Sequence, residues 1–62
     1  MNNNFDIAIV QQSGGIYFWA LRRVEPYEVL ATSRILDAKH IIEKQAQEIA
    51  DEFELVIMVE ER

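Results

Sequence analysis

A pair of glycines near the start of the chain separates two segments that both have the composition of β-strands. Residues 5–11 alternate between apolar and other side chains, as the residues of a half-buried strand do. Gly14-Gly15 follows, and glycine supplies the positive φ that tight hairpin turns need. Residues 16–24 are rich in aromatic and β-branched side chains, which favour strands. The sequence therefore predicts a β-hairpin.

The rest of the chain predicts a third strand, a helix and a fourth strand. Pro26 breaks the second strand because it lacks an N–H, and residues 27–33 are expected to form the third. Asp37 is a good N-cap for a helix. An apolar stripe at helical spacing follows it, made of Ala38, Ile41, Ile42, Gln45, Ala46, Ile49, Ala50 and Phe53. Residues 55–59 form a short apolar run, which predicts a final strand covered on both faces.

The expected fold class is α+β, with the element order β-β-β-α-β. Local connections favour an antiparallel β-meander with one helix packed on one face. Residues 1–62 are expected to form a single small domain with residues 1–4 as a disordered start. The pattern leaves open where the last strand joins the sheet.

The short length and the absence of cysteine limit how such a domain gains stability. A domain of 62 residues buries only about 60% of the surface that its unfolded chain exposes. With no cysteine, disulfides and cysteine metal sites are excluded, so oligomerisation remains as a source of stability. No apolar run reaches the roughly 20 residues of a membrane helix, and no signal-peptide pattern is seen. We expect a cytoplasmic protein that does not bind a membrane.

A register for the sheet follows if the hairpins close around Gly14 and Glu25. One face then carries a seat for the helix, composed of Ile7, Ile9, Trp19, Leu21, Val29 and Ala31. The opposite face is also apolar, whereas a solvated face should be polar, and such a patch usually marks an interface. The candidate interface residues are Val10, Phe18, Ala20, Leu30 and Met58, with Val56 as an alternative to Met58. Alternatively, the final strand or the loops cover this face. The register also has an alternative, since closure of the first hairpin on Gly14-Gly15 alone would exchange the two faces.

One row of the second face is charged. The same register places Arg22 between Asp6 and Glu28 on the neighbouring strands, an arrangement that stabilises a sheet. Arg22, Arg23 and Arg34, with nearby aromatic residues, are also the ingredients of a platform for nucleic-acid bases. The net charge of −5 opposes that hypothesis, because binding to nucleic acid depends on neutralising phosphates.

Residues that carry chemistry are few. His40 is expected on the wet side of the helix, without the partner and pocket that catalysis needs. Ser13-Gly14-Gly15 lacks the lysine of a phosphate loop, and Glu60-Glu61 is expected to be a solubilising end. We therefore predict neither an enzyme nor a cofactor or metal site.

Three strand segments together resemble the YegP-like small domains. The residues that carry the resemblance are Phe5-Asp6-Ile7, Gly15, Tyr17-Phe18-Trp19-Ala20-Leu21-Arg22 and Glu28-Val29-Leu30-Ala31-Thr32-Ser33. Asp37 stands where that family usually has a Ser or Thr helix cap. The resemblance implies a β-β-β-α fold, homodimers and no established activity, and it supplies no catalytic residue.

The sequence therefore favours a small interaction module that associates with itself through a sheet face. Two alternatives remain open. The first is an acidic inhibitor of phage type that docks on a basic surface of an enzyme, which the charge of −5 and the small size favour. The second is weak binding to nucleic acid.

Overall fold

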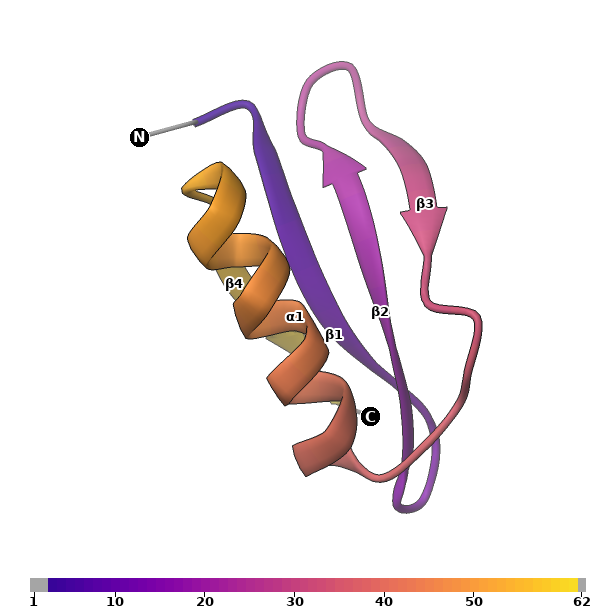
Figure 1. Ribbon diagram of the computed structural model, residues 1–62. Helices are drawn as coiled ribbons and strands as arrows, with labels where there is room; N and C mark the ends of the chain where they lie inside the picture. Colours follow the sequence, from indigo (N-terminus) through magenta and orange to yellow (C-terminus); the bar gives the residue numbers. More distant parts are fainter. Residues whose placement is uncertain (1–2, 62) are drawn as a thin grey trace.

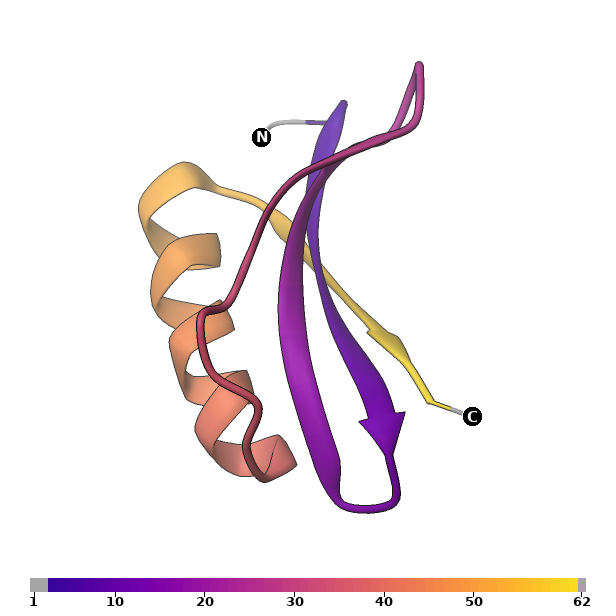
Figure 2. The same ribbon diagram turned by 90° about the vertical axis from the view of Figure 1, so that its right-hand side faces the viewer.

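The computed structural model describes residues 3–61 of the chain. The elements follow the expected order β-β-β-α-β (Figure 1), and their bounds are β1 Phe5–Ser13, β2 Ile16–Arg23, β3 Glu28–Thr32, α1 Lys39–Phe53 and β4 Val56–Glu60. The four strands form one sheet, and α1 packs on one side of it against β1, β2 and β4. Figure 2 shows that the other side of the sheet has no helix.

The strand order is β3-β2-β1-β4, so the last strand joins the sheet beside the first. β1 pairs antiparallel with β2 and β2 antiparallel with β3, whereas β4 runs parallel to β1. The expected meander is therefore right for three strands and wrong for the fourth. The reason is that α1 carries the chain back along the sheet, as a crossover helix does, so that β4 starts at the same end as β1 (Figure 1).

The first hairpin has the expected register along most of its length. Ile9 lies opposite Trp19, and the same offset holds back to the pair formed by Phe5 and Arg23. The turn itself is the two-residue loop Gly14-Gly15, with Gly15 at a φ of 76°. A bulge after Gln11 takes up one residue, so closure on the two glycines does not exchange the faces.

The register of the second hairpin differs from the expected one. The first pair after the turn is Arg23 with Glu28, and Tyr27 belongs to the turn. A second bulge follows, because Arg22 pairs with Val29 while Leu21 pairs with Ala31. Val29 therefore shares a face with Arg22, away from the expected helix seat. Leu30 is the extra residue and lines a hollow on the helix side, together with Phe5, Leu21, Phe53 and Leu55.

The core lies between α1 and the centre of the sheet. Ile7, Ile9 and Ile42 are completely buried there. They are packed with the other buried side chains of the cluster, Tyr17, Ala46 and Ala50. Trp19 packs against this cluster, and its indole Nε1–H donates to Gln45 Oε1 at 3.1 Å. That bond explains why a glutamine lies on the apolar stripe, since a partly buried indole N–H needs an acceptor.

The segments directly before and directly after α1 are fixed by backbone hydrogen bonds. The helix begins at Lys39, two residues after the expected N-cap, because the backbone of Asp37 pairs with Tyr17. The Asp37 carboxylate accepts the adjacent N–H, that of Ala38, and α1 has no side-chain cap from its N-cap residue. After Phe53 the chain turns at Glu54 in the left-handed conformation, with φ 56°, and this geometry ends helices.

The start of the described chain is fixed to the second hairpin. Asn4 accepts the N–H of Val24 on its carbonyl oxygen at 2.7 Å and that of Glu25 on its side chain. Asn4 of the expected disordered start therefore has hydrogen-bond partners in the turn after β2, and Met1 and Asn2 lie outside the described residues.

Candidate interaction surface

The side of the sheet without a helix, here called the open face, is built by the alternate residues of each strand. Asp6 lies opposite Arg22 and Val56, which fixes which residues share this side. The apolar members are Ala8, Val10, Phe18, Ala20, Val29, Val56 and Met58. The sequence left open whether Met58 or Val56 lies on this face, and the structure places both of them there. Figure 2 shows this side edge-on, opposite α1.

Ala8 and Ala20 are buried on the open face although no helix covers them. Ala8 has no exposed surface and Ala20 only 3%. They lie opposite one another on β1 and β2. On this face the pair of alanines forms one cross-strand row, with the row of Asp6 on one side of it and the row of Val10 on the other. Side chains of nearby strand residues must therefore shield them, and Met58 lies beside Ala8 in the same row.

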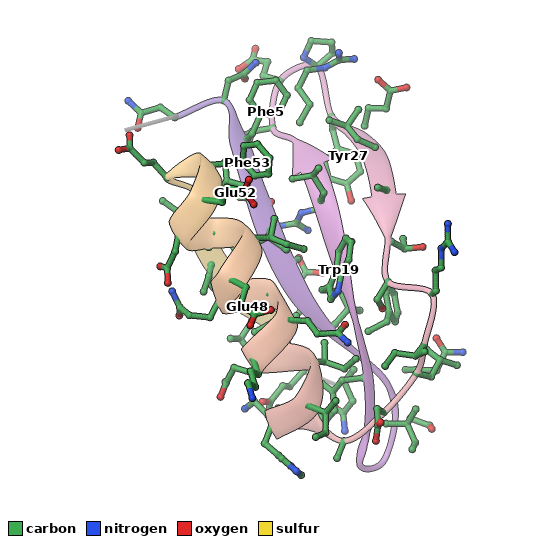
Figure 3. The ribbon with its side chains drawn as sticks, viewed as in Figure 1. Phe5, Trp19, Tyr27, Glu48, Glu52 and Phe53 are labelled. Atoms are coloured by element: carbon green, nitrogen blue, oxygen red, sulfur yellow. The ribbon has the colours of Figure 1, made fainter. Side chains whose placement is uncertain are left out.

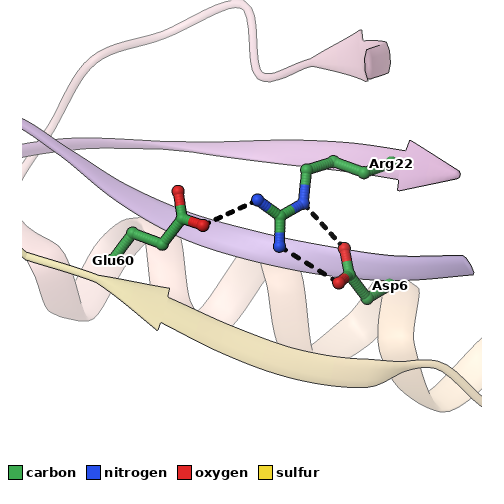
Figure 4. Close-up of polar contacts among 3 residues, drawn as sticks. All are labelled: Asp6, Arg22 and Glu60. Atoms are coloured by element: carbon green, nitrogen blue, oxygen red, sulfur yellow. Dashed lines mark hydrogen bonds and ion pairs between the residues drawn. The ribbon is translucent and has the colours of Figure 1, made fainter. Parts of the chain in front are cut away.

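We infer from the position of its ion pairs that Arg22 provides part of that cover. Its guanidinium makes a two-pronged contact with the Asp6 carboxylate, from Nε at 2.8 Å and from Nη2 at 3.0 Å. The remaining nitrogen, Nη1, donates to Glu60 at 2.7 Å. Glu60 lies opposite Val10 on β4, so the hydrogen bonds of the guanidinium, drawn in Figure 4, connect the row of Asp6 with the row of Val10.

The environment of Arg22 keeps it charged. The hydrogen bond to Asp6 raises the pKa of Arg22, and the contact with Glu60 raises it further against the opposing effect of burial. The Tyr27 ring lies 5.8 Å from the guanidinium carbon, which is within range of a cation–π contact. Two strands and a turn therefore converge on one arginine, which is only 9% exposed.

The second carboxylate of this cluster differs from the expected one. Glu28 binds Arg23 at 2.6 Å instead of Arg22, because the bulge in β3 places it opposite Arg23. Glu60, expected in a solubilising end, takes its place. The alternation of Val56, Met58 and Glu60 would have placed Glu60 on this side, had the position of the last strand been known.

The candidate interface residues divide into three groups. Val10 and Phe18 are half-buried on the open face, and Met58 is 45% exposed there. Ala20 is buried under the arginine cluster. The placement of Leu30 on this face is wrong, since the hollow that it lines lies on the helix side. The final strand extends the sheet at its edge and does not cover the open face.

The side chains considered for other chemistry lie apart. His40 is exposed on the outer side of α1, the side on which Figure 3 shows Glu48. Arg22 and Arg23 point to opposite faces and are each paired with carboxylates, so they do not join Arg34 in a basic platform. Among residues 3–61, no three His, Cys, Asp or Glu side chains are grouped to hold a metal ion.

Comparisons with known proteins return no relative. No protein-family model, no curated protein and no solved structure matches this chain. The resemblance to the YegP-like domains stays a prediction from the sequence. Within the described part of the chain, no helix has the length and apolarity to cross a membrane.

Proposed function

We propose that this chain is a non-catalytic interaction module that associates with a second copy of itself through the open face. The observation that carries the proposal is an apolar sheet face whose charges are already paired. Its strand residues carry three charges, on Asp6, Arg22 and Glu60, and all three belong to one cluster. Both carboxylates bind the one guanidinium of Arg22, so a partner that covers this face would bury no carboxylate that lacks a cationic contact, which lowers the cost of burying these ions.

The distribution of the remaining charge favours a second copy. The net charge is −5, and most of the acidic side chains lie on α1, in the turns and at the chain end. In a face-to-face pair the two helices would lie on the outside, so the acidic surfaces would be separated by two sheets. The helix–sheet–sheet–helix layering that results is one of the stable arrangements of such elements.

The size of the face is sufficient for a weak dimer. Four strands about 4.8 Å apart, in a sheet about 25 Å long, give roughly 500 Å² in projection. Two such faces would bury about 1,000 Å², which is the lower limit for a specific interface. An interface of this size is compatible with a dissociation constant in the micromolar range, which is the value expected for this dimer.

Sedimentation equilibrium across a concentration series tests the proposal, with variants that differ in the face they alter. We expect Phe18→Asp and Met58→Lys to shift the protein to monomer, because each buries a charge between the two sheets. Leu30→Asp is the matched control: it also adds a charge to an apolar side chain, but on the helix side, and should leave the dimer intact.

Two outcomes would contradict the proposal. A wild-type protein that stays monomeric at millimolar concentration would refute self-association. Equal weakening by Phe18→Asp and Leu30→Asp would place the contact elsewhere. Circular dichroism of each variant separates loss of the dimer from loss of the fold.

A further inference from the structure

A bulge directs one leucine of β3 to the helix side of the sheet. Leu30 is the extra residue, because Arg22 pairs with Val29 while Leu21 pairs with Ala31. Bulges re-aim a side chain and are over-represented next to functional sites. Among the described elements, α1 packs against β1, β2 and β4 but not against β3. No helix therefore covers the position to which the bulge directs this leucine, and Leu30 stays 44% exposed.

The hollow beside this leucine, here called the Leu30 hollow, has only apolar side chains as walls. It has a volume of about 200 Å³, and its walls are Phe5, Leu21, Leu30, Phe53 and Leu55. Three strands, the end of α1 and the segment before β4 therefore meet around it. Phe53 is 58% exposed, so a large part of this apolar surface faces outward.

The size and the lining of the Leu30 hollow indicate its occupant. Small-molecule sites usually have about 300–1,000 Å³ and a few placed polar groups, whereas this hollow is smaller and has no polar side chain in its lining. An apolar cavity of about 150 Å³ accommodates benzene, so there is room for one phenyl ring. Phe5 and Phe53 favour such a ring, because aromatic rings pack well edge to face. The hollow therefore fits a single phenylalanine side chain.

The charge beside the hollow favours a basic neighbour for that phenylalanine. Glu52 is exposed and lies next to Phe53 in Figure 3. Among residues 3–61, its carboxylate has no ion-pair partner. Arg23, on the same side of the sheet, is already bound to Glu28 and to the carbonyl oxygen of Pro26. The hollow makes the site, and the negative charge next to it selects a basic segment, as does the net charge of −5.

A second copy of this chain does not fit the Leu30 hollow. The chain has three phenylalanines. Phe5 and Phe53 are walls of the hollow, and Phe18 lies on the open face. A copy that inserted one of these rings would lose its own hollow or its own open face. The occupant is therefore a different protein.

We propose that the Leu30 hollow binds a phenylalanine side chain of a partner protein, in a segment that carries Lys or Arg next to it. The ring packs among the five apolar side chains, and the cation lies at Glu52. Burial of the ring supplies most of the affinity, because exposed ion pairs contribute little. Aromatic anchors that fill pockets are typical centres of protein interfaces. The site lies on the helix side and does not depend on self-association through the open face.

Titration with a synthetic peptide, followed by NMR spectra of the wild-type protein, tests this site. The probe is a capped peptide of sequence Gly-Lys-Ser-Phe-Ser-Lys-Gly. One control has Ala in place of Phe, and a second has Glu in place of both Lys residues. We expect the Phe peptide to shift the side-chain signals of Leu30 and Phe53 and to leave those of Val10 and Met58 unchanged. It should bind about tenfold more tightly than the Ala peptide and more tightly than the Glu peptide.

Two pairs of protein variants sharpen the test. Leu30→Ala removes a wall of the hollow and should weaken binding of the Phe peptide about fivefold. Leu36→Ala changes another exposed leucine, outside the hollow, and should leave the affinity unchanged. Glu52→Gln should weaken binding about threefold, as expected for an exposed ion pair. Glu43→Gln is its control, since Glu43 lies on the same helix but lines a different hollow.

Several outcomes would overturn the proposal. These are no binding, equal binding of the Phe and Ala peptides, and equal loss in Leu30→Ala and Leu36→Ala. N-acetylphenylalanine amide is the probe for a free small molecule. If it binds as tightly as the peptide, the hollow is a small-molecule site and the proposed protein partner is wrong. Peptide binding at the hollow that weakens as the protein concentration rises would mean that a second copy occupies it.

Discussion

The two faces of the sheet bury their central rows by different means. On the helix side Ile7 and Ile9 are shielded by aliphatic side chains of α1, Ile42 foremost. On the open face Ala8 is buried without a helix above it, and we infer that Arg22, a charged side chain held by two carboxylates, shields its row. The comparison shows that complete burial does not require a second layer of secondary structure. A small residue under a long, paired side chain gives the same exclusion of water.

The difference also separates stability from association. The helix side uses its apolar residues for folding, so their loss should destabilise the monomer. The open face covers its centre within the chain and leaves Phe18, Val10 and Met58 around the arginine cluster, where a partner would bury them. Substitutions on the two faces should therefore have different consequences.

The largest effect is expected for Ile42→Ala on the helix side. Ile42 is completely buried, and the substitution leaves a cavity, so the free energy of unfolding should fall by about 3 kcal/mol. The neighbouring Ile41 is 36% exposed, and Ile41→Ala should cost about 1 kcal/mol or less. Urea unfolding measures both, and similar losses at the two positions would contradict the location of the core.

A smaller loss is expected for Arg22→Met on the open face. The substitution keeps the length of the side chain but leaves the Asp6 carboxylate, whose side chain is 14% exposed, without its partner. Because Glu60 is half-exposed and regains water, we expect a loss of about 2 kcal/mol, below the cost of a fully buried pair.

Arg23→Met is the control for the arginine cluster. Arg23 is the next residue, on the opposite face, and its ion pair with Glu28 is exposed. Such pairs contribute about 0–1 kcal/mol, so urea unfolding should show little change. A loss as large as that of Arg22→Met would mean that the cluster has no special role.

A loss smaller than that of Arg22→Met is expected for Ala8→Val. The added methyl groups would press on the guanidinium from below and should cost about 1 kcal/mol. Ala31→Val, at an exposed position of β3, adds the same atoms without this obstacle and should be neutral within about 0.5 kcal/mol. Thermal unfolding compares the two, and a neutral Ala8→Val would show that Arg22 does not lie close over the alanine row.

The first hairpin was predictable because its signals are local. Residues 5–11 alternate and Gly14-Gly15 marks the turn, and these signals predict the hairpin. The pairing of Ile9 with Trp19 was one of two expected registers, and the bulge after Gln11 preserves it. The second hairpin was not predictable, because nothing in the composition of β3 indicates the bulge at Leu30. Because of that one extra residue, Leu30 lies on the helix side and Glu28 lies opposite Arg23.

The arginine cluster was predictable only in part, for a similar reason. Asp6 and Arg22 are neighbours within the first hairpin, so their pairing was expected and is confirmed. Glu60 is 38 residues from Arg22 and reaches it only because β4 lies parallel to β1. That placement depends on the path of α1 across the sheet, which no local pattern indicates. The helix start is a further case, since Asp37 is used in a bridge to Tyr17.

Isotope-filtered NMR on an equal mixture of ¹³C-labelled and unlabelled protein tests the central claim most directly, because it detects only contacts between copies. The account predicts intermolecular NOEs from the Phe18 ring to the methyl groups of Val10 and Met58. Intermolecular NOEs confined to the helix side, at Phe53 and Leu30, or none at a concentration of about 1 mM, well above the expected dissociation constant, would contradict it.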